Sequence, residues 1–189
     1  TQKHPLNSPV TPTHAPARPT LTTTDTNPRD RSEALGRSRG GLTSKIHLAC
    51  DGQGRPLAFT ITAGNVNDCT QFEAVMDRIK VARPGPGRPR TRPDRVVADK
   101  GYSARKIRAY LRRRGIACTI PERIDQINGR LRRHETLCRL DKTAYRRRNV
   151  VERCFSRLKQ NRALATRYDK RAAHYQAMVT LACLQLWLP

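Results

Sequence analysis

The stretch that decides the fold class is RVVADKGYSARKIRAYLRRRGIACTI, residues 95–120. It begins with a short β-branched run that ends at Asp99, and residues 103–114 then have helical spacing until Gly115 closes them. Residues 116–120 form a second apolar run, which is typical of another strand. The order strand, helix, strand predicts a chain of the α/β class, in which helices cover a sheet.

The residues ahead of this stretch predict a hairpin followed by a helix. Residues 42–50 and 57–61 are strand-like runs, and the turn DGQG between them supplies the aspartate and glycines of a hairpin. Asp68 precedes an apolar stripe at helical spacing, with Gln71 three residues on, so we expect Asp68 to cap a helix. Residues 83–93, RPGPGRPRTRP, contain too many prolines for a helix or a central strand and indicate a basic loop.

After residue 120 the pattern predicts two more helices. Residues 122–141 are polar and irregular, residues 142–165 are expected to form one long helix, and residues 172–188 a last one. The whole order favours a mixed β-sheet flanked by helices. Residues 1–41 are rich in Thr, Pro and Arg without periodicity, which predicts a disordered tail.

The composition points to an anionic polymer as partner. Lys and Arg number 38 against 15 Asp and Glu, a net charge of +23, and 30 of the 38 are arginine, whose planar fork fits phosphates and guanine edges. Packing on RNA or plain surface charge would explain the charge equally well. The six cysteines form no C-x-x-C pair, so we expect no zinc site and a reducing cytoplasm. The longest apolar stretch is shorter than the roughly 20 residues of a spanning helix, so no membrane partner is expected.

Asp99 and Glu152 are the candidate catalytic acids. Asp99 ends a strand, where a side chain projects into the crevice in which α/β sites form, although an aspartate in a turn is common. Tyr145, Arg148, Glu152 and Lys159 are spaced by three, four and seven residues and share one stripe of the expected helix. A neighbouring apolar stripe places Glu152 at the margin of the buried face. The competing interpretation is a solvated helix with an Arg148–Glu152 pair, worth only a few tenths of a kcal/mol.

Two sequence strings resemble motifs of the bacterial insertion-sequence DDE transposases. VVADKGY at 96–102 resembles the strand that ends in the family's second catalytic aspartate, and YRRRNVVERCFSRLKQNR at 145–162 matches its tyrosine-arginine-glutamate signature at every step. The resemblance covers roughly residues 36–187. It implies a ribonuclease-H-like fold with a five-stranded mixed sheet, in which three acids gather two Mg²⁺ or Mn²⁺ ions.

The same resemblance implies roles for single residues and a reaction. Asp99 would be the second acid and Glu152 the third, and both would bind metal. Tyr145, Arg148 and Lys159 would contact DNA, Arg148 by holding either Glu152 or the backbone. The implied reaction is metal-dependent cleavage and strand transfer of double-stranded DNA at the element's ends, by a homo-oligomer in the cytoplasm, at the nucleoid.

The sequence departs from the family at its first acid, which should end an apolar strand upstream of GRSRGG. Asp25 and Asp30 follow no apolar run, Asp51 is expected in a turn, and Asp68 is expected to cap a helix on a connection that can approach the site. Residues 42–189 are therefore predicted to be a DDE catalytic domain without its first strand and first aspartate, with weak metal binding. Two alternatives stay open: a non-catalytic basic nucleic-acid-binding protein, and a nuclease of the same fold without strand transfer.

Overall fold

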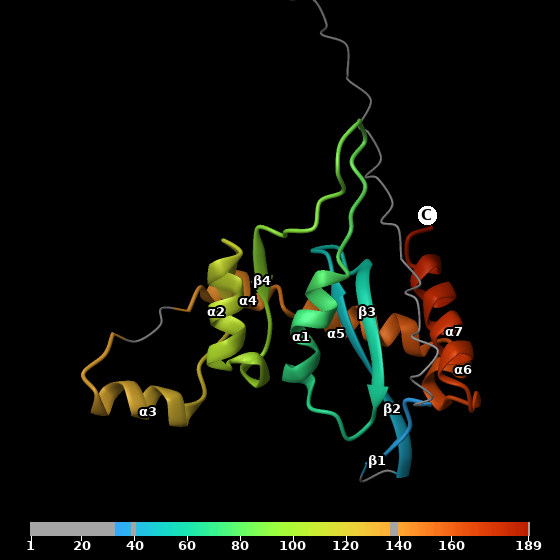
Figure 1. Ribbon diagram of the computed structural model, residues 1–189, viewed down its shortest axis with the longest axis horizontal. Helices are drawn as coiled ribbons and strands as arrows, with labels where there is room; N and C mark the ends of the chain where they lie inside the picture. Colours follow the sequence, from blue (N-terminus) through green and yellow to red (C-terminus); the bar gives the residue numbers. More distant parts are fainter. Residues whose placement is uncertain (1–32, 39–40, 137–139, 189) are drawn as a thin grey trace, which may run out of the picture.

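The structure is a computed structural model that describes residues 33–38, 41–136 and 140–188. Most of the tail that the sequence predicts, residues 1–32, lies outside the described residues, as do Asp25, Asp30 and Cys138. The remainder combines helices with two small sheets, so the α/β class is confirmed (Figure 1).

The first sheet is antiparallel and has the order β1-β2-β3. Its strands are β1 (Gly36–Ser38), β2 (Gly41–Cys50) and β3 (Pro56–Ala63). The predicted hairpin is thus confirmed, and Asp51 closes its turn by accepting from the backbone N–H groups of Gln53 and Arg55, each at 2.9 Å. β1 lies within the range that the sequence assigned to the tail, so regular structure begins ahead of the expected residue 42.

The second sheet pairs β4 (Arg95–Val97) with β5 (Ala117–Thr119) in parallel. The chain crosses between them through the short η1 (Lys100–Tyr102) and α2 (Arg105–Arg113), and Gly115 follows α2 at φ +63°. The predicted strand, helix, strand order is confirmed. Among the described residues no hydrogen bonds join the two sheets, so they do not form one five-stranded sheet.

Helices cover both faces of the β2–β3 hairpin (Figure 1). On one face, α1 (Asp68–Asp77) packs with α2 in a core that includes Phe72, Met76 and Leu111. On the other, α5 (Asn149–Lys159), α6 (Arg162–Thr166) and α7 (Ala172–Gln185) bury Leu158 and Val179 against the sheet. Because both faces are covered, His47, a polar residue of β2 that alternates with its apolar ones, is buried as well.

Two expectations about the helices were wrong. The single helix expected over 142–165 is three helices, α4 (Lys142–Arg146), α5 and α6. α6 is separate from α5 because Asn161 caps a new helix by accepting from the Ala163 N–H at 3.2 Å. The stretch expected to be irregular contains α3 (Ile124–Arg132). None of the α3 residues is buried: its apolar residues Ile124, Ile127 and Leu131 have helical spacing, but they pack into neither core.

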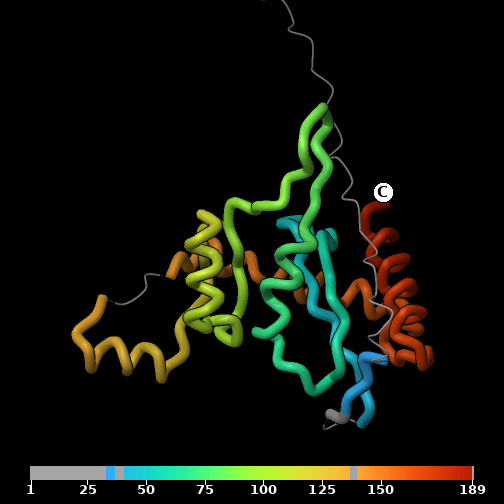
Figure 2. The backbone as a smooth tube through the Cα atoms, viewed as in Figure 1, coloured from blue at the N-terminus to red at the C-terminus, as the bar shows by residue number. Residues whose placement is uncertain are grey.

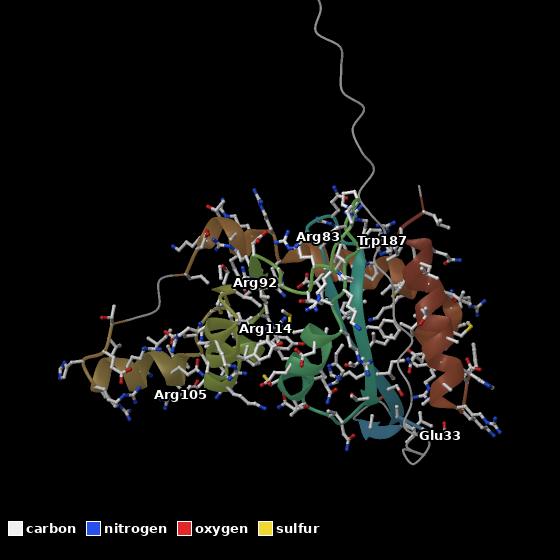
Figure 3. All side chains as sticks on the ribbon, turned by 45° about the horizontal axis from the view of Figure 1, so that its top comes forward. Glu33, Arg83, Arg92, Arg105, Arg114 and Trp187 are labelled. Atoms are coloured by element: carbon white, nitrogen blue, oxygen red, sulfur yellow. The ribbon has the colours of Figure 1, made fainter. Side chains whose placement is uncertain are left out.

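The last predicted helix is confirmed as α7, and the start of the described chain is attached to it. Glu33 accepts from the Ala172 N–H at 2.7 Å, and Arg167 donates to the Ala34 carbonyl at 3.0 Å. Figure 3 shows Glu33 beside the N-terminal end of α7. Within the described part of the chain, no helix combines the length and apolar character needed to cross a membrane.

Candidate active site

Asp99 lies where the sequence predicts it, just beyond the end of β4. Its side chain caps η1 by accepting from the Gly101 N–H at 2.8 Å, and the residue is exposed. A carboxylate at this point is anchored through one oxygen and open to solvent, which suits a group that must meet a substrate or a metal ion.

The start of α1 packs against the loop that holds Asp99. The Cys69 thiol donates to the Gly101 carbonyl, and the rings of Phe72 and Tyr102 lie 5.9 Å apart. Burial raises the pKa of Cys69, and the carboxylates of Asp68 and Asp99 raise it further. The pKa of Tyr102 is raised by burial and by the same two carboxylates. The structure therefore brings Asp68 into the neighbourhood of Asp99.

Asp68 is not the helix cap that its position in the sequence predicts. Asn67 caps α1 instead, because its extended backbone lets its side chain accept from the Cys69 N–H at 3.0 Å. Asp68 is left free to bind side chains of β2. Its Oδ1 lies 3.3 Å from the Lys45 ammonium and 3.3 Å from Nδ1 of His47.

His47 is a polar residue that the sequence reasoning missed. Its side chain is only 3% exposed, and its Nε2 lies 2.7 Å from the Thr62 hydroxyl. Burial lowers the pKa of His47, while Asp68 opposes the shift and Lys45 adds to it. Alternation of Lys45 and His47 with apolar residues is typical of a solvated strand face. The apolar stripe of α1 was the signal that this face is covered, because that stripe needs a sheet face on which to pack.

The lowered pKa of His47 predicts a stability that falls on acidification. Since the folded pKa lies below the unfolded value of 6.5, the unfolded chain binds the proton first, and stability present above 6.5 is lost as the pH falls toward the folded pKa. Melting temperatures measured from about pH 8 to about pH 5.5 should fall more steeply for the wild type than for His47→Gln. The exposed His174→Gln is the matched control and should follow the wild type. Equal slopes for all three proteins would contradict the assignment.

Glu152 belongs to a short series of contacts on α4 and α5. Its carboxylate pairs with the Arg148 guanidinium at 2.7 Å, and this guanidinium lies 5.7 Å from the ring centroid of Tyr145. The Glu152 side chain is 53% exposed, so it lies in solvent and not at the margin of the buried face where the sequence predicted it. Lys159 is exposed in the last turn of α5 and stands apart from these contacts. Three of the four signature residues are thus joined, with Arg148 at the centre.

The elements that carry the two acids border one cavity of about 460 Å³, but neither Asp99 nor Glu152 is among the residues that line it. Val97, two residues before Asp99, lines it from β4, and Arg148 and Val151 line it from the turn that holds Glu152. Arg95 and Asp141 form part of the wall and pair at 2.9 Å. The strand end that precedes Asp99 and the first turn of α5 are therefore neighbours across this cavity.

Within the described ranges, no group of three or more His, Cys, Asp or Glu residues is placed to hold a metal ion. The two candidate acids are hard oxygen donors, which is the ligand type that Mg²⁺ prefers. Asp51 is used by its turn and pairs with Arg55, as expected for a turn residue. The donor chemistry fits Mg²⁺, while a third acidic ligand is not found among the described residues.

The chain matches the family model of the transposase DDE domain over residues 15–187. The chain belongs to this family. The match to the DDE transposase domain spans all the described helices and strands, including β4, which precedes Asp99, and α5 with Glu152.

Two curated relatives of this DDE transposase domain are named as transposases of insertion sequences. A Burkholderia cepacia protein, named for element IS402, is 36% identical over 160 residues, which make up 85% of this chain and 66% of the relative. A Brucella ovis protein, named for element IS6501, is 27% identical over 147 residues, or 78% of this chain and 99% of the relative. This chain thus spans just under two thirds of the IS402 relative. No solved structure matches it.

Proposed function

We propose that this DDE transposase domain acts in the transposition of an insertion sequence by cleaving and joining DNA strands in a metal-dependent reaction. The observation that carries the proposal is the Tyr145–Arg148–Glu152 series of contacts, which stands across one cavity from the strand end before Asp99. Membership of the family and the names of the two relatives support it.

Each residue has a distinct part in the proposed reaction. Asp99 and Glu152 would hold Mg²⁺ or Mn²⁺, with two ions in an intact site. When bound, the metal would lower the pKa of the attacking hydroxyl and stabilise charge on the phosphate oxygens. Arg148 fixes the Glu152 carboxylate through their 2.7 Å pair. Lys159, exposed at the end of α5, is free to contact a DNA phosphate, and the Tyr145 ring lies 5.7 Å from the Arg148 guanidinium and would help to position it.

We further propose that residues 42–189 form a ribonuclease-H-like catalytic domain whose sheet lacks one strand among the described residues. In this proposal the antiparallel β2–β3 pair and the parallel β4–β5 pair would be the two halves of a mixed sheet. One strand between β2 and β4, ending in an aspartate, would join these two pairs into five strands and add the third acid. β1, which pairs only with residues 41–43 of β2, lies outside that count. The proposed partners are double-stranded DNA and further copies of the chain assembled on it, in the cytoplasm at the nucleoid.

The charge distribution predicts strong, salt-dependent binding to duplex DNA. Residues 105–171 contain 22 Lys and Arg against 6 Asp and Glu. Each phosphate neutralised contributes about −0.9 to the slope of log K against log salt, so several contacts should give a slope of about −5 or steeper. Fluorescence anisotropy with a labelled duplex at increasing salt measures this slope. A slope near −0.9, the value for about one phosphate contact, would argue against a surface that contacts several phosphates along duplex DNA.

Strand cleavage separates the proposal from its alternatives. A non-catalytic basic nucleic-acid-binding protein, which the net charge of +23 favours, would bind duplex DNA but leave it intact in Mn²⁺. A nuclease of the same fold would cut the strands without joining them to a target. The decisive assay uses duplex DNA with the element's own ends, with Mn²⁺ or with a chelator, and follows both cut and joined products.

A further inference from the structure

A basic arm stands out from the rest of the fold between α1 and β4 (Figures 1 and 2). We call residues 83–93 the arm; their sequence is RPGPGRPRTRP, and residues 83–92 are all exposed. None of the candidate active-site residues lies on it, and it leaves the body at the start of β4, the end opposite Asp99. Its charge therefore needs an explanation of its own.

The base of the arm is fixed to the body. Val81 and Arg90 exchange backbone hydrogen bonds of 2.9 and 2.8 Å across it. The Arg90 guanidinium pairs with Asp94, and Arg114, at the end of α2, donates to the Thr91 carbonyl at 3.2 Å. Arg90 of the arm and Arg114 of the body thus hold the base of the arm in place, and the arm has a defined direction.

The arginines farther out are free. Arg83 and Arg88 form no ion pair within the described part of the chain, in contrast to Arg90. No acidic residue occurs between positions 78 and 93, so no carboxylate of the arm itself offsets their charge. Two unpaired guanidinium groups on an exposed projection attract a polyanion.

The shape of the arm favours the minor groove of duplex DNA. The tip has only glycine and proline beside its arginines, so it is slender, and the prolines restrict its conformations before binding. An arm without aromatic rings cannot stack on unpaired bases, which argues against single strands. The minor groove is about 6 Å wide, which admits a thin extended segment rather than a helix.

The choice of basic residue agrees with this groove. Every basic residue of the arm is arginine, whose guanidinium sheds water more readily than an ammonium group. Narrow minor grooves of A·T tracts have an enhanced negative potential that attracts inserted arginines. From the Val81–Arg90 bridge to the tip there are about five residues, which span at most about 17 Å, enough to reach past the body into a groove.

We propose that the arm inserts into the minor groove of A·T-rich duplex DNA, with Arg83 and Arg88 as the side chains that enter it. The proposal rests on the proposed function, since it takes double-stranded DNA as the partner. Because the arm lies at the end of β4 opposite Asp99, it contacts duplex flanking the reacting phosphodiester and governs binding rather than strand cleavage.

The test compares Arg83→Ala/Arg88→Ala with Arg112→Ala/Arg132→Ala, which removes the same charge from exposed positions on α2 and α3. Affinities for an A·T-tract duplex and a G·C duplex of equal length are measured without metal by fluorescence anisotropy, with and without the minor-groove ligand netropsin. The affinity of the arm variant for the A·T duplex should be about tenfold lower than that of the wild type. The arm variant should also no longer prefer the A·T duplex over the G·C duplex. The control variant should keep the preference, and netropsin should abolish it in the wild type.

The outcomes separate the arm from the proposed function. If the wild type binds both duplexes equally, or if the arm variant keeps the A·T preference, the minor-groove proposal is wrong while duplex binding by the body stands. If the wild type binds no duplex DNA at all, both the arm's role and the DNA partner of the proposed function are refuted. Thermal melting of the arm variant checks its fold, and because the tip makes no contacts with either core the melting temperature should match the wild type.

Discussion

Glu152→Gln is expected to reduce metal-dependent DNA cleavage by more than about a hundredfold, because glutamine keeps the side chain's size but loses the charge that holds the metal. The effect is best measured in a chain whose residues 1–35 are replaced by the segment that precedes the counterpart of Gly36 in the IS402 relative. If that segment provides the strand between β2 and β4 with its aspartate, the extended chain should cleave in Mn²⁺ while the 189-residue chain shows little or no cleavage.

The matched control for this prediction is Glu135→Gln, the same chemical change at an exposed glutamate that pairs with Arg133. It should leave cleavage unchanged, whereas Asp99→Asn should match the loss in Glu152→Gln. Robust cleavage by the 189-residue chain that survives Asp99→Asn would show that other residues are the catalytic acids.

Leu111→Ala is expected to lower the free energy of unfolding by about 2–5 kcal/mol. Leu111 is fully buried in the core that α2 shares with α1, so alanine leaves a cavity that the neighbouring side chains fill only in part. Such a loss is a large part of the roughly 5–15 kcal/mol that stabilises a domain. Because α2 follows the loop of Asp99 directly, this core also holds the candidate acid in place.

The same substitution at Leu181, which is 60% exposed on α7, should change the stability by no more than about 0.5 kcal/mol. Urea unfolding followed by circular dichroism gives both values, and an unchanged m-value would show that only stability has changed. Equal losses at the two positions would mean that α1 and α2 do not share the tight core described above.

Helices and strands were predictable from the sequence where the residues that specify them lie close together in the chain. The β2–β3 hairpin depends on the aspartate and glycines of its turn, and α2 on its apolar stripe and the glycine that ends it. The Arg148–Glu152 contact was also predictable, since residues four apart on a helix are neighbours. In contrast, α3 and the break between α5 and α6 were not predicted. α3 has no buried face, and the break depends on a cap inside a run of helix-forming residues.

The sequence by itself determined the α/β class, the net charge of +23 and the positions of Asp99 and Glu152 at a strand end and on a helix. Only the tertiary structure decided that Asp68 binds the buried His47, and that β4 and α5 border one cavity. The physical reason is distance along the chain. Caps, turns and stripes are formed by neighbours in sequence, whereas the burial of His47 and the meeting of β4 with α5 depend on how α1 and α5 pack on opposite faces of the same hairpin.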